Sequence, residues 1–158
     1  NINKFNIIGP KIINSKLENS NPFMSKRISK KEIIFWNIYY KSFYMSRIFN
    51  FLLMIRKIFS KKKVVNSIQK VYAIHGSAML ISKVFFKKGG ILDSDFQLFC
   101  EELSMAEISR KISCSIFFVP ELELKHDEHY TLKNISPKKK FQMAKNSHQY
   151  FLSHYIKK

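Results

Sequence analysis

The sequence has little cysteine, glycine or proline: two, four and four residues among 158. Two cysteines are too few for a disulfide framework, and Cys100 and Cys114 do not have the spacing of a metal site, so a reducing cytoplasm fits best. The scarcity of glycine and proline argues against long flexible linkers. Together these absences point to one continuous domain rather than a disulfide-rich or linker-rich chain.

Long apolar runs are also missing. The longest uninterrupted one, Phe51 to Ile55, is far too short to span a bilayer, and no signal peptide opens the chain. The first residue is asparagine rather than methionine, which suggests a piece of a longer protein. An apolar share of 46% and an aromatic share of 15% nevertheless predict a packed core in a single domain, residues 1–158.

Acidic residues are few, and the net charge of +17 calls for an anionic partner. Nucleic acid, an anionic membrane surface and a sugar-nucleotide or phospholipid substrate all qualify. The 28 cations are 24 lysines and four arginines, which argues against nucleic acid because phosphate-fork and base-edge recognition favour arginine. An AT-rich genome is the alternative explanation for the excess of lysine.

The few carboxylates are concentrated in one acidic segment, from Asp93 to Glu128, which holds nine of the 11 acidic residues and only three cations. Clustered carboxylates repel one another, and they persist where they serve as a base, a metal site or a polyol-binding site. The acidic residues are Asp93, Asp95, Glu101, Glu102, Glu107, Glu121, Glu123, Asp127 and Glu128.

Periodicity and turn residues predict an α/β protein. We expect a loop over 14–31, a helix over 32–59 broken near Asn50, and a last helix that starts at Ser136-Pro137. The expected strands cover 5–13 (interrupted at Gly9-Pro10), 71–74, 115–119 and 121–126, with Pro120 between the last two. Two more helices are expected. One is short, from Ser82 to Phe86, and ends at Gly89-Gly90; the other covers 98–112 and has an apolar stripe of Leu98, Met105, Ile108 and Ile112.

The basic, aromatic segment 32–63 has two interpretations. Its rings and lysines suit a helix that lies in a membrane interface, with cations on anionic lipid. The alternative is a pair of helices that covers the core of its own domain.

Three groups of residues carry possible chemistry. Glu101 and Glu102 flank the apolar stripe of the helix over 98–112. Partial desolvation and a like-charged neighbour raise the pKa of a carboxyl group there, which suits a general base. The alternative is a solvated pair of glutamates at a helix N-terminus. His126, followed by Asp127, Glu128 and His129, suits a divalent metal, or else is a satisfied core histidine. Asp93-Ser94-Asp95 is a literal Asp-x-Asp, which we interpret as a turn that enters a helix rather than a metal site.

Taken together, the block from Val71 to His126 resembles the C-terminal half of family 2 glycosyltransferases, which have the GT-A fold. The matching elements occur in the order and spacing of that family. They are His75-Gly76-Ser77-Ala78-Met79-Leu80, Gly89-Gly90-Ile91-Leu92-Asp93, Phe99-Cys100-Glu101-Glu102, Val119-Pro120-Glu121 and the strand that ends at His126.

The resemblance implies a partial GT-A fold, a mixed sheet with flanking helices, and a role for each matching residue. Glu102 would be the base that deprotonates the acceptor hydroxyl, with Glu101 as its neighbour, and His126 would help to hold a divalent metal, Mg or Mn. The segment His75-Gly76-Ser77-Ala78 would lie beside the substrates. The implied reaction is an inverting transfer from a nucleotide-diphosphate sugar to a saccharide or lipid-linked acceptor, at the cytoplasmic face of the cell membrane.

The sequence departs from the family in its N-terminal half, because nothing before Ile7 can supply the nucleotide-binding strands or their Asp-x-Asp. We therefore expect an acceptor-side part of such an enzyme, truncated or split. The alternative is a non-catalytic basic module that binds an anionic membrane or nucleic acid, which would explain the charge but not the acidic segment.

Overall fold

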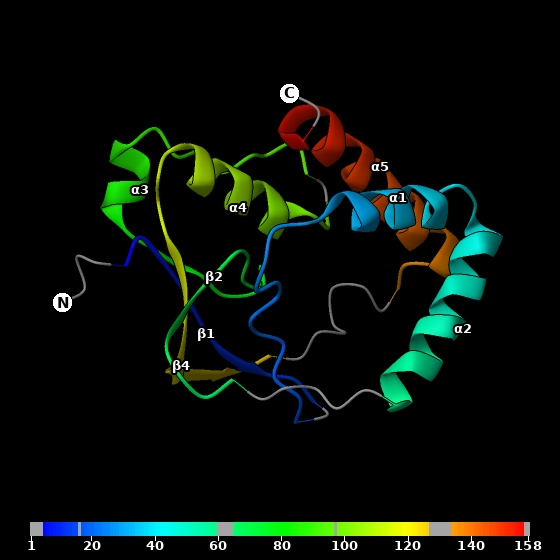
Figure 1. The fold of residues 1–158 in the computed structure, drawn as a ribbon, viewed down its shortest axis with the longest axis horizontal. Helices are drawn as coiled ribbons and strands as arrows, with labels where there is room; N and C mark the ends of the chain where they lie inside the picture. Colours follow the sequence, from blue (N-terminus) through cyan, green and yellow to red (C-terminus); the bar gives the residue numbers. More distant parts are fainter. Residues whose placement is uncertain (1–4, 16, 60–64, 97, 127–133, 157–158) are drawn as a thin grey trace.

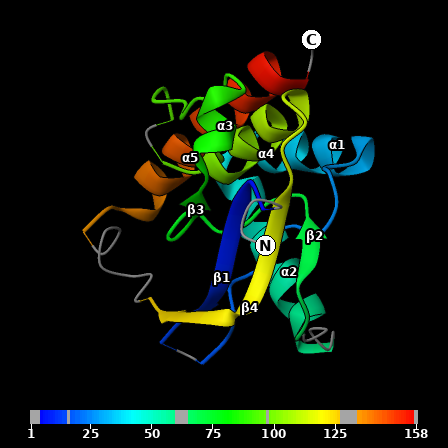
Figure 2. The same ribbon diagram turned by 90° about the vertical axis from the view of Figure 1, so that its left-hand side faces the viewer.

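The computed structural model describes residues 5–15, 17–59, 65–96, 98–126 and 134–156. Its centre is a four-stranded mixed sheet in the order β2-β4-β1-β3, flanked by helices (Figures 1 and 2). β1 runs parallel to β4 and antiparallel to β3, while β2 pairs antiparallel with β4. The predicted α/β class and mixed sheet are confirmed. The strands are β1 (Ile7–Ile13), β2 (Gln69–Val71), β3 (Leu80–Ile81) and β4 (Ile116–Lys125).

Several helices begin or end where local sequence signals place them. The Ser136 hydroxyl accepts a hydrogen bond from the Lys139 N–H at 3.3 Å, and Pro137 occupies the first turn of α5. Gly89 takes a left-handed φ of +86° just beyond α3, as the glycine pair predicts. The helices are α1 (Lys30–Tyr39), α2 (Phe43–Phe59), α3 (Lys83–Lys87), α4 (Glu101–Lys111), α5 (Pro137–Phe151) and a π-helical turn η2 (Leu152–Ile156).

The break in the predicted helix over 32–59 lies elsewhere than expected. α1 ends at Tyr39 and α2 begins at Phe43, so the prediction of a break near Asn50 is wrong. Tyr40, at the end of α1, packs on α5, with its ring 4.9 Å from that of His148 and 5.9 Å from that of Phe141. This contact with a distant helix, which no local signal encodes, accompanies the turn between α1 and α2.

Pro120 does not end a strand, contrary to the prediction. β4 continues through it to Lys125, while its register against β1 changes from Pro10 opposite Val119 to Lys11 opposite Glu123. Residues 120–122 therefore have no partner on β1, and the missing N–H of the proline removes no hydrogen bond from the ladder.

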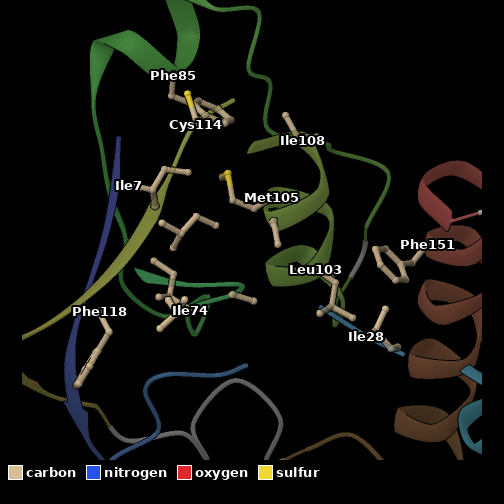
Figure 3. Close-up of a cluster of buried hydrophobic side chains, with 14 of the residues drawn as sticks. Ile7, Ile28, Ile74, Phe85, Leu103, Met105, Ile108, Cys114, Phe118 and Phe151 are labelled. Atoms are coloured by element: carbon tan, nitrogen blue, oxygen red, sulfur yellow. The ribbon is translucent and has the colours of Figure 1, made fainter. Parts of the chain in front are cut away.

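α4 packs against the sheet, and its buried side chains form part of the hydrophobic core (Figure 3). Met105 and Ile108, two members of the predicted stripe, are buried with Ile7 of β1 and with Ile74, which follows β2. α4 begins three residues later than the expected start at 98. Because this packing anchors the helix, its N-terminal end, where Glu101 and Glu102 lie, is held beside the segment that follows Ile74.

α2 lies at one side of the molecule, away from the strands (Figure 1). α1 contacts it through the Phe35 and Phe49 rings, 5.1 Å apart, and through a 3.0 Å hydrogen bond from the Tyr39 hydroxyl to Asn50 Oδ1. Residues 50–56 are all exposed, and Lys61, Lys62 and Lys63 lie outside the described residues. None of the helices in the described ranges is long and apolar enough to cross a bilayer.

Candidate active site

A cavity of about 520 Å³ lies at the N-terminal end of α4. Its polar lining includes four residues singled out in the sequence, which reach it from three separate segments: His75, Glu101, Glu102 and His126. Its aromatic lining comes from Phe23, Trp36, Tyr40 and Phe99. An apolar cavity with a few convergent polar groups is the usual form of a small-molecule site.

The backbone at Gly76 contacts the glutamate pair directly. Its N–H donates a hydrogen bond to Glu102 Oε1 at 3.1 Å. A Cβ at this position would lie 3.1 Å from Glu102 Oε1 and 3.2 Å from Glu101 Oε1, closer than most real Cβ contacts. Glycine therefore lets the chain approach both carboxylates.

Glu102 is buried, with 8% of its surface exposed. Burial first, and then the charge of Glu101, raise its pKa from an ordinary 4.5 to about 7; its own backbone N–H and that of Gly76 oppose the rise. A carboxyl group with this pKa is partly ionised at neutral pH, so it can accept a proton. It also retains that proton near neutral pH, as a general base must during the reaction. One oxygen of the neighbour, Glu101 Oε2, is buried and has no hydrogen-bond partner among the described residues.

The two residues before α4 have strained backbone. Phe99 and Cys100 both take left-handed φ angles, 71° and 66°, which cost non-glycine residues about 1 kcal/mol or more each. These angles set the direction in which the chain enters the first turn of α4, and so the place of Glu101 and Glu102. Strain of this kind is concentrated at functional sites.

Cys100 also lines the cavity, but it is not a suitable nucleophile. Burial, followed by the charges of Glu102 and Glu101, raises the pKa of its thiol to about 12. The reactive form of cysteine is the thiolate, which is not populated at neutral pH under these conditions. The ionisable carboxyl at this site is therefore the better candidate for proton transfer.

His75 is oriented by backbone contacts on both sides. Its N–H donates to Asn21 Oδ1 at 2.7 Å, and the buried Asn21 donates in turn to the Pro10 carbonyl at 2.8 Å, which ties the segment to β1. The Ser77 N–H donates to His75 Nδ1 at 3.2 Å, so the proton of the neutral ring lies on Nε2. Asn21 was not predicted, because it lies in the expected loop 14–31.

The expected substrate-binding segment is shared between two cavities. His75 lines the aromatic cavity, whereas Gly76, Ser77 and Ala78 line a second one of about 430 Å³. Glu101 lines both of them. Glu101 thus lies where two neighbouring cavities meet, while Glu102 beside it lines the aromatic cavity alone; two adjoining cavities suit two substrates.

His126 lines the aromatic cavity, with its ring centroid 6.2 Å from that of His75. Asp127, Glu128 and His129, the expected companions of His126, lie outside the described residues. Within the described ranges, no three His, Cys, Asp or Glu side chains are placed to hold a metal ion together. The described part of the chain therefore offers His126 as a single ligand rather than a complete metal site.

His148 of α5 is a cavity residue that the sequence did not identify as functional. It is 3% exposed, and burial lowers its pKa to about 4, so the ring is neutral. Its Nε2 is buried and has no hydrogen-bond partner in the described part of the chain. The only signal in the sequence is its spacing from Phe141 and Phe151, which places it on the apolar face of the last helix, where a core histidine would also lie.

Asp93 and Asp95 hold the C-terminal region of the chain in place. The Tyr150 hydroxyl donates to Asp95 Oδ2 at 2.9 Å and to Asp93 Oδ2 at 3.3 Å, and the Tyr155 hydroxyl also donates to Asp93. The Asp95 N–H donates to Asp93 Oδ1 at 3.0 Å, which closes a local turn. In the structure this Asp-x-Asp thus joins its turn to α5 and η2.

Comparison with known protein families, curated proteins and solved structures found no match. The geometry of the aromatic cavity therefore carries the functional argument. A buried carboxyl with a pKa near neutrality, a second carboxylate beside it and aromatic walls are compatible with proton abstraction from a polyol bound in the cavity.

Proposed function

We propose that the chain is the acceptor-side part of an inverting glycosyltransferase with a partial GT-A fold. The observation that carries this proposal is the Glu102 carboxyl, which is buried in the wall of the aromatic cavity beside Glu101 and has a pKa of about 7. The mixed sheet with flanking helices is compatible with this architecture. The ordered resemblance from Val71 to His126 gives the reaction class.

In the proposed reaction an acceptor hydroxyl oxygen attacks the anomeric carbon of a nucleotide-diphosphate sugar. The new glycosidic bond forms as the bond from that carbon to the diphosphate oxygen breaks, and Glu102 takes the hydroxyl proton. Because Glu102 is buried beside Glu101, its protonated form is stabilised relative to an exposed carboxyl. A divalent metal, Mg or Mn, is expected in the complete enzyme; it would need ligands besides His126, and we assign no step to it.

The aromatic cavity is the proposed acceptor site. Trp36, Tyr40 and Phe23 offer flat apolar faces on which a sugar ring can lie, while the Glu102 carboxyl and the neutral His148 ring can bind its hydroxyls. The second cavity, lined by Gly76 and Ser77, then faces the donor side. We propose a saccharide, free or linked to a lipid, as the acceptor.

The first test uses the full native protein with a panel of nucleotide-diphosphate sugars and saccharide acceptors. Release of nucleoside diphosphate is the readout, and Glu102→Gln should lower kcat at least a thousandfold while KM for the acceptor changes little. Glu121→Gln, at an exposed position on β4, is the matched control and should keep full activity. Activity of Glu102→Gln equal to that of the native protein would refute the assignment of the base.

Acceptor binding can be tested separately with the 158-residue chain. Trp36 is the only tryptophan of the sequence and lines the aromatic cavity, so its fluorescence reports on binding there. Saccharides that act as acceptors should change its emission saturably. A Trp36→Phe variant should lose the signal but retain binding in a calorimetric titration, and an unchanged emission with every acceptor would argue against this cavity.

For location, we propose a peripheral position at the inner face of the cell membrane, with α2 as the contact. Phe51, Leu52 and Met54 are 57%, 54% and 54% exposed, although they are large and apolar. Arg47 and Arg56 are exposed on the same helix, which carries no acidic residue. Exposed apolar side chains mixed with cations suit a surface of anionic lipid.

The same surface also favours the second candidate, a non-catalytic basic module for an anionic membrane. The two functions differ in what Glu102→Gln does. In a transferase this change abolishes turnover and leaves lipid binding intact, whereas in a membrane module only changes to α2 have an effect on function.

A further inference from the structure

A basic cavity lies at the other end of α4, away from the candidate active site. Its volume is about 600 Å³, it is open to solvent, and it is lined by the segment 25–27, β2, the C-terminal half of α4 and the turn that follows. Lys26, Arg27, Lys70 and Arg110 line it. Ser109, which also lines it, lies seven residues after Glu102 on α4, which is about 10 Å along the helix axis.

One buried carboxylate holds the two arginines in fixed positions. Glu107 is fully buried, and it accepts hydrogen bonds from Arg27 Nε at 2.7 Å, from Arg110 Nη2 at 2.9 Å and from the Tyr72 hydroxyl at 2.9 Å. Each guanidinium gives a second bond to the same carboxylate, Arg27 Nη2 and Arg110 Nε both at 3.1 Å from Oε2. The forks are therefore oriented before any ligand arrives, which lowers the entropy cost of binding.

The cavity keeps a positive charge after this pairing. Glu107 offsets one of the two arginines, while Lys26 and Lys70 have no carboxylate within ion-pair distance in the described part of the chain. In the same ranges, the Nη1 groups of Arg27 and Arg110 have no protein acceptor. Three positive charges and several N–H donors are thus available to an anion.

A buried hydroxyl in the wall gives an independent indication of a ligand. Ser109 is 1% exposed, and its Oγ has no hydrogen-bond partner among the described residues. Leaving a buried polar group without a partner costs about 1–3 kcal/mol, so such groups call for an explanation. Because Ser109 is one of the residues that line the cavity, rotation about its Cα–Cβ bond would turn this hydroxyl toward a ligand oxygen there.

We propose that this cavity binds a phosphate or diphosphate group. Arg27 and Arg110 would bind its oxygens through their free N–H groups, Lys26 and Lys70 would act as point charges, and the Ser109 hydroxyl would donate. The proposal does not depend on glycosyl transfer, because it uses none of the residues of the aromatic cavity. The phosphate can belong to a soluble metabolite or to a lipid headgroup, since the chemistry is the same.

The test titrates the 158-residue chain with inorganic pyrophosphate at constant ionic strength, by calorimetry and by broadening of the ³¹P resonance. We expect saturable binding that weakens at least tenfold in Ser109→Ala and in the pair Lys26→Gln/Lys70→Gln. The control pair Lys138→Gln/Lys139→Gln makes the same change in net charge at exposed sites on α5 and should alter binding less than twofold. Urea unfolding establishes that each variant is folded.

If both lysine pairs lose the same affinity for pyrophosphate, or if Ser109→Ala has no effect on it, the binding is non-specific charge attraction and the proposal is overturned. Absence of saturable binding would overturn the proposal outright. The source of the phosphate is separated with vesicles of phosphatidic acid in phosphatidylcholine. If Ser109→Ala weakens both pyrophosphate and vesicle binding, the ligand is a lipid headgroup. If it weakens pyrophosphate binding alone, the ligand is soluble.

Discussion

Replacing Glu102 by glutamine should make the protein more stable at alkaline pH and leave it unchanged in acid. The pKa of this carboxyl rises from 4.5 to about 7 on folding because of burial and the neighbouring charge of Glu101. The native state therefore binds the proton more tightly than the unfolded state does, and stability falls as pH rises from about 4.5 through 7. At about 1.4 kcal/mol per pKa unit, the full loss is about 3 kcal/mol.

Glutamine has the same shape but never ionises, so this loss is absent from the variant. Its side-chain oxygen can still accept the hydrogen bond that Gly76 donates to Glu102 Oε1. We expect Glu102→Gln and the native protein to have similar free energies of unfolding near pH 4. At pH 8 the variant should be more stable by up to about 3 kcal/mol, with most of the change between pH 5 and 7.

Urea denaturation of both proteins from pH 4 to pH 8.5 measures this difference. Titrating groups distant from Glu102 cancel in the comparison, so the difference belongs to Glu102 and the neighbours that interact with its charge, Glu101 and Cys100. Glu121→Gln, which removes an exposed carboxylate on β4, is the control for the loss of one acidic side chain. A variant that is equally or less stable than the native protein at pH 8 would refute the reasoning, because Glu102 would then be ionised without penalty.

Three other predictions concern different parts of the molecule. Glu107→Gln should lower the free energy of unfolding by about 2–4 kcal/mol at pH 7, measured by urea denaturation, because it breaks a buried ion pair with several hydrogen bonds. Burial opposes ionisation of Glu107, but hydrogen bonds from the two arginines outweigh burial and lower its pKa. The native protein therefore loses its greater stability over the variant as pH falls below about 4.5. Gly76→Ala should change the free energy of unfolding by about 1 kcal/mol, but it should lower the initial rate of the proposed glycosyl transfer at least tenfold, because its methyl group displaces the carboxylates. An unchanged rate would contradict the close approach. Phe51→Ser/Leu52→Ser should leave stability within about 0.5 kcal/mol and reduce co-sedimentation with anionic vesicles at least fivefold, and equal sedimentation would exclude α2 as the contact.

The acidic segment shows how far a sequence pattern can be followed. Its carboxylates are clustered along the chain, but the fold distributes them among separate environments. Glu102 faces the aromatic cavity, Glu107 lies between two arginines, Asp93 accepts bonds from two tyrosines, and Glu123 pairs with Lys11 at 2.9 Å. Successive residues of a helix point in different directions, so closeness in sequence does not mean a shared site.

Element boundaries were predictable where the signal is local. Ser136-Pro137 begins a helix and Gly89 follows the end of another, because caps and left-handed turns depend only on residues within one turn. The break after Tyr39 and the passage of β4 through Pro120 were not predictable. The first accompanies packing of Tyr40 on α5, and the second depends on a register change against β1.

From the sequence alone came the α/β class, the strong basic charge and the candidates Glu101, Glu102, His75 and His126, because periodicity, charge and residue type are properties of the chain itself. The tertiary structure alone decided which of them meet. Folding brought α1 and α5 to the cavity as walls and buried Glu102, and this burial moved the pKa of Glu102 toward neutrality. Desolvation depends on atoms brought together from distant segments, and only the folded chain contains that information.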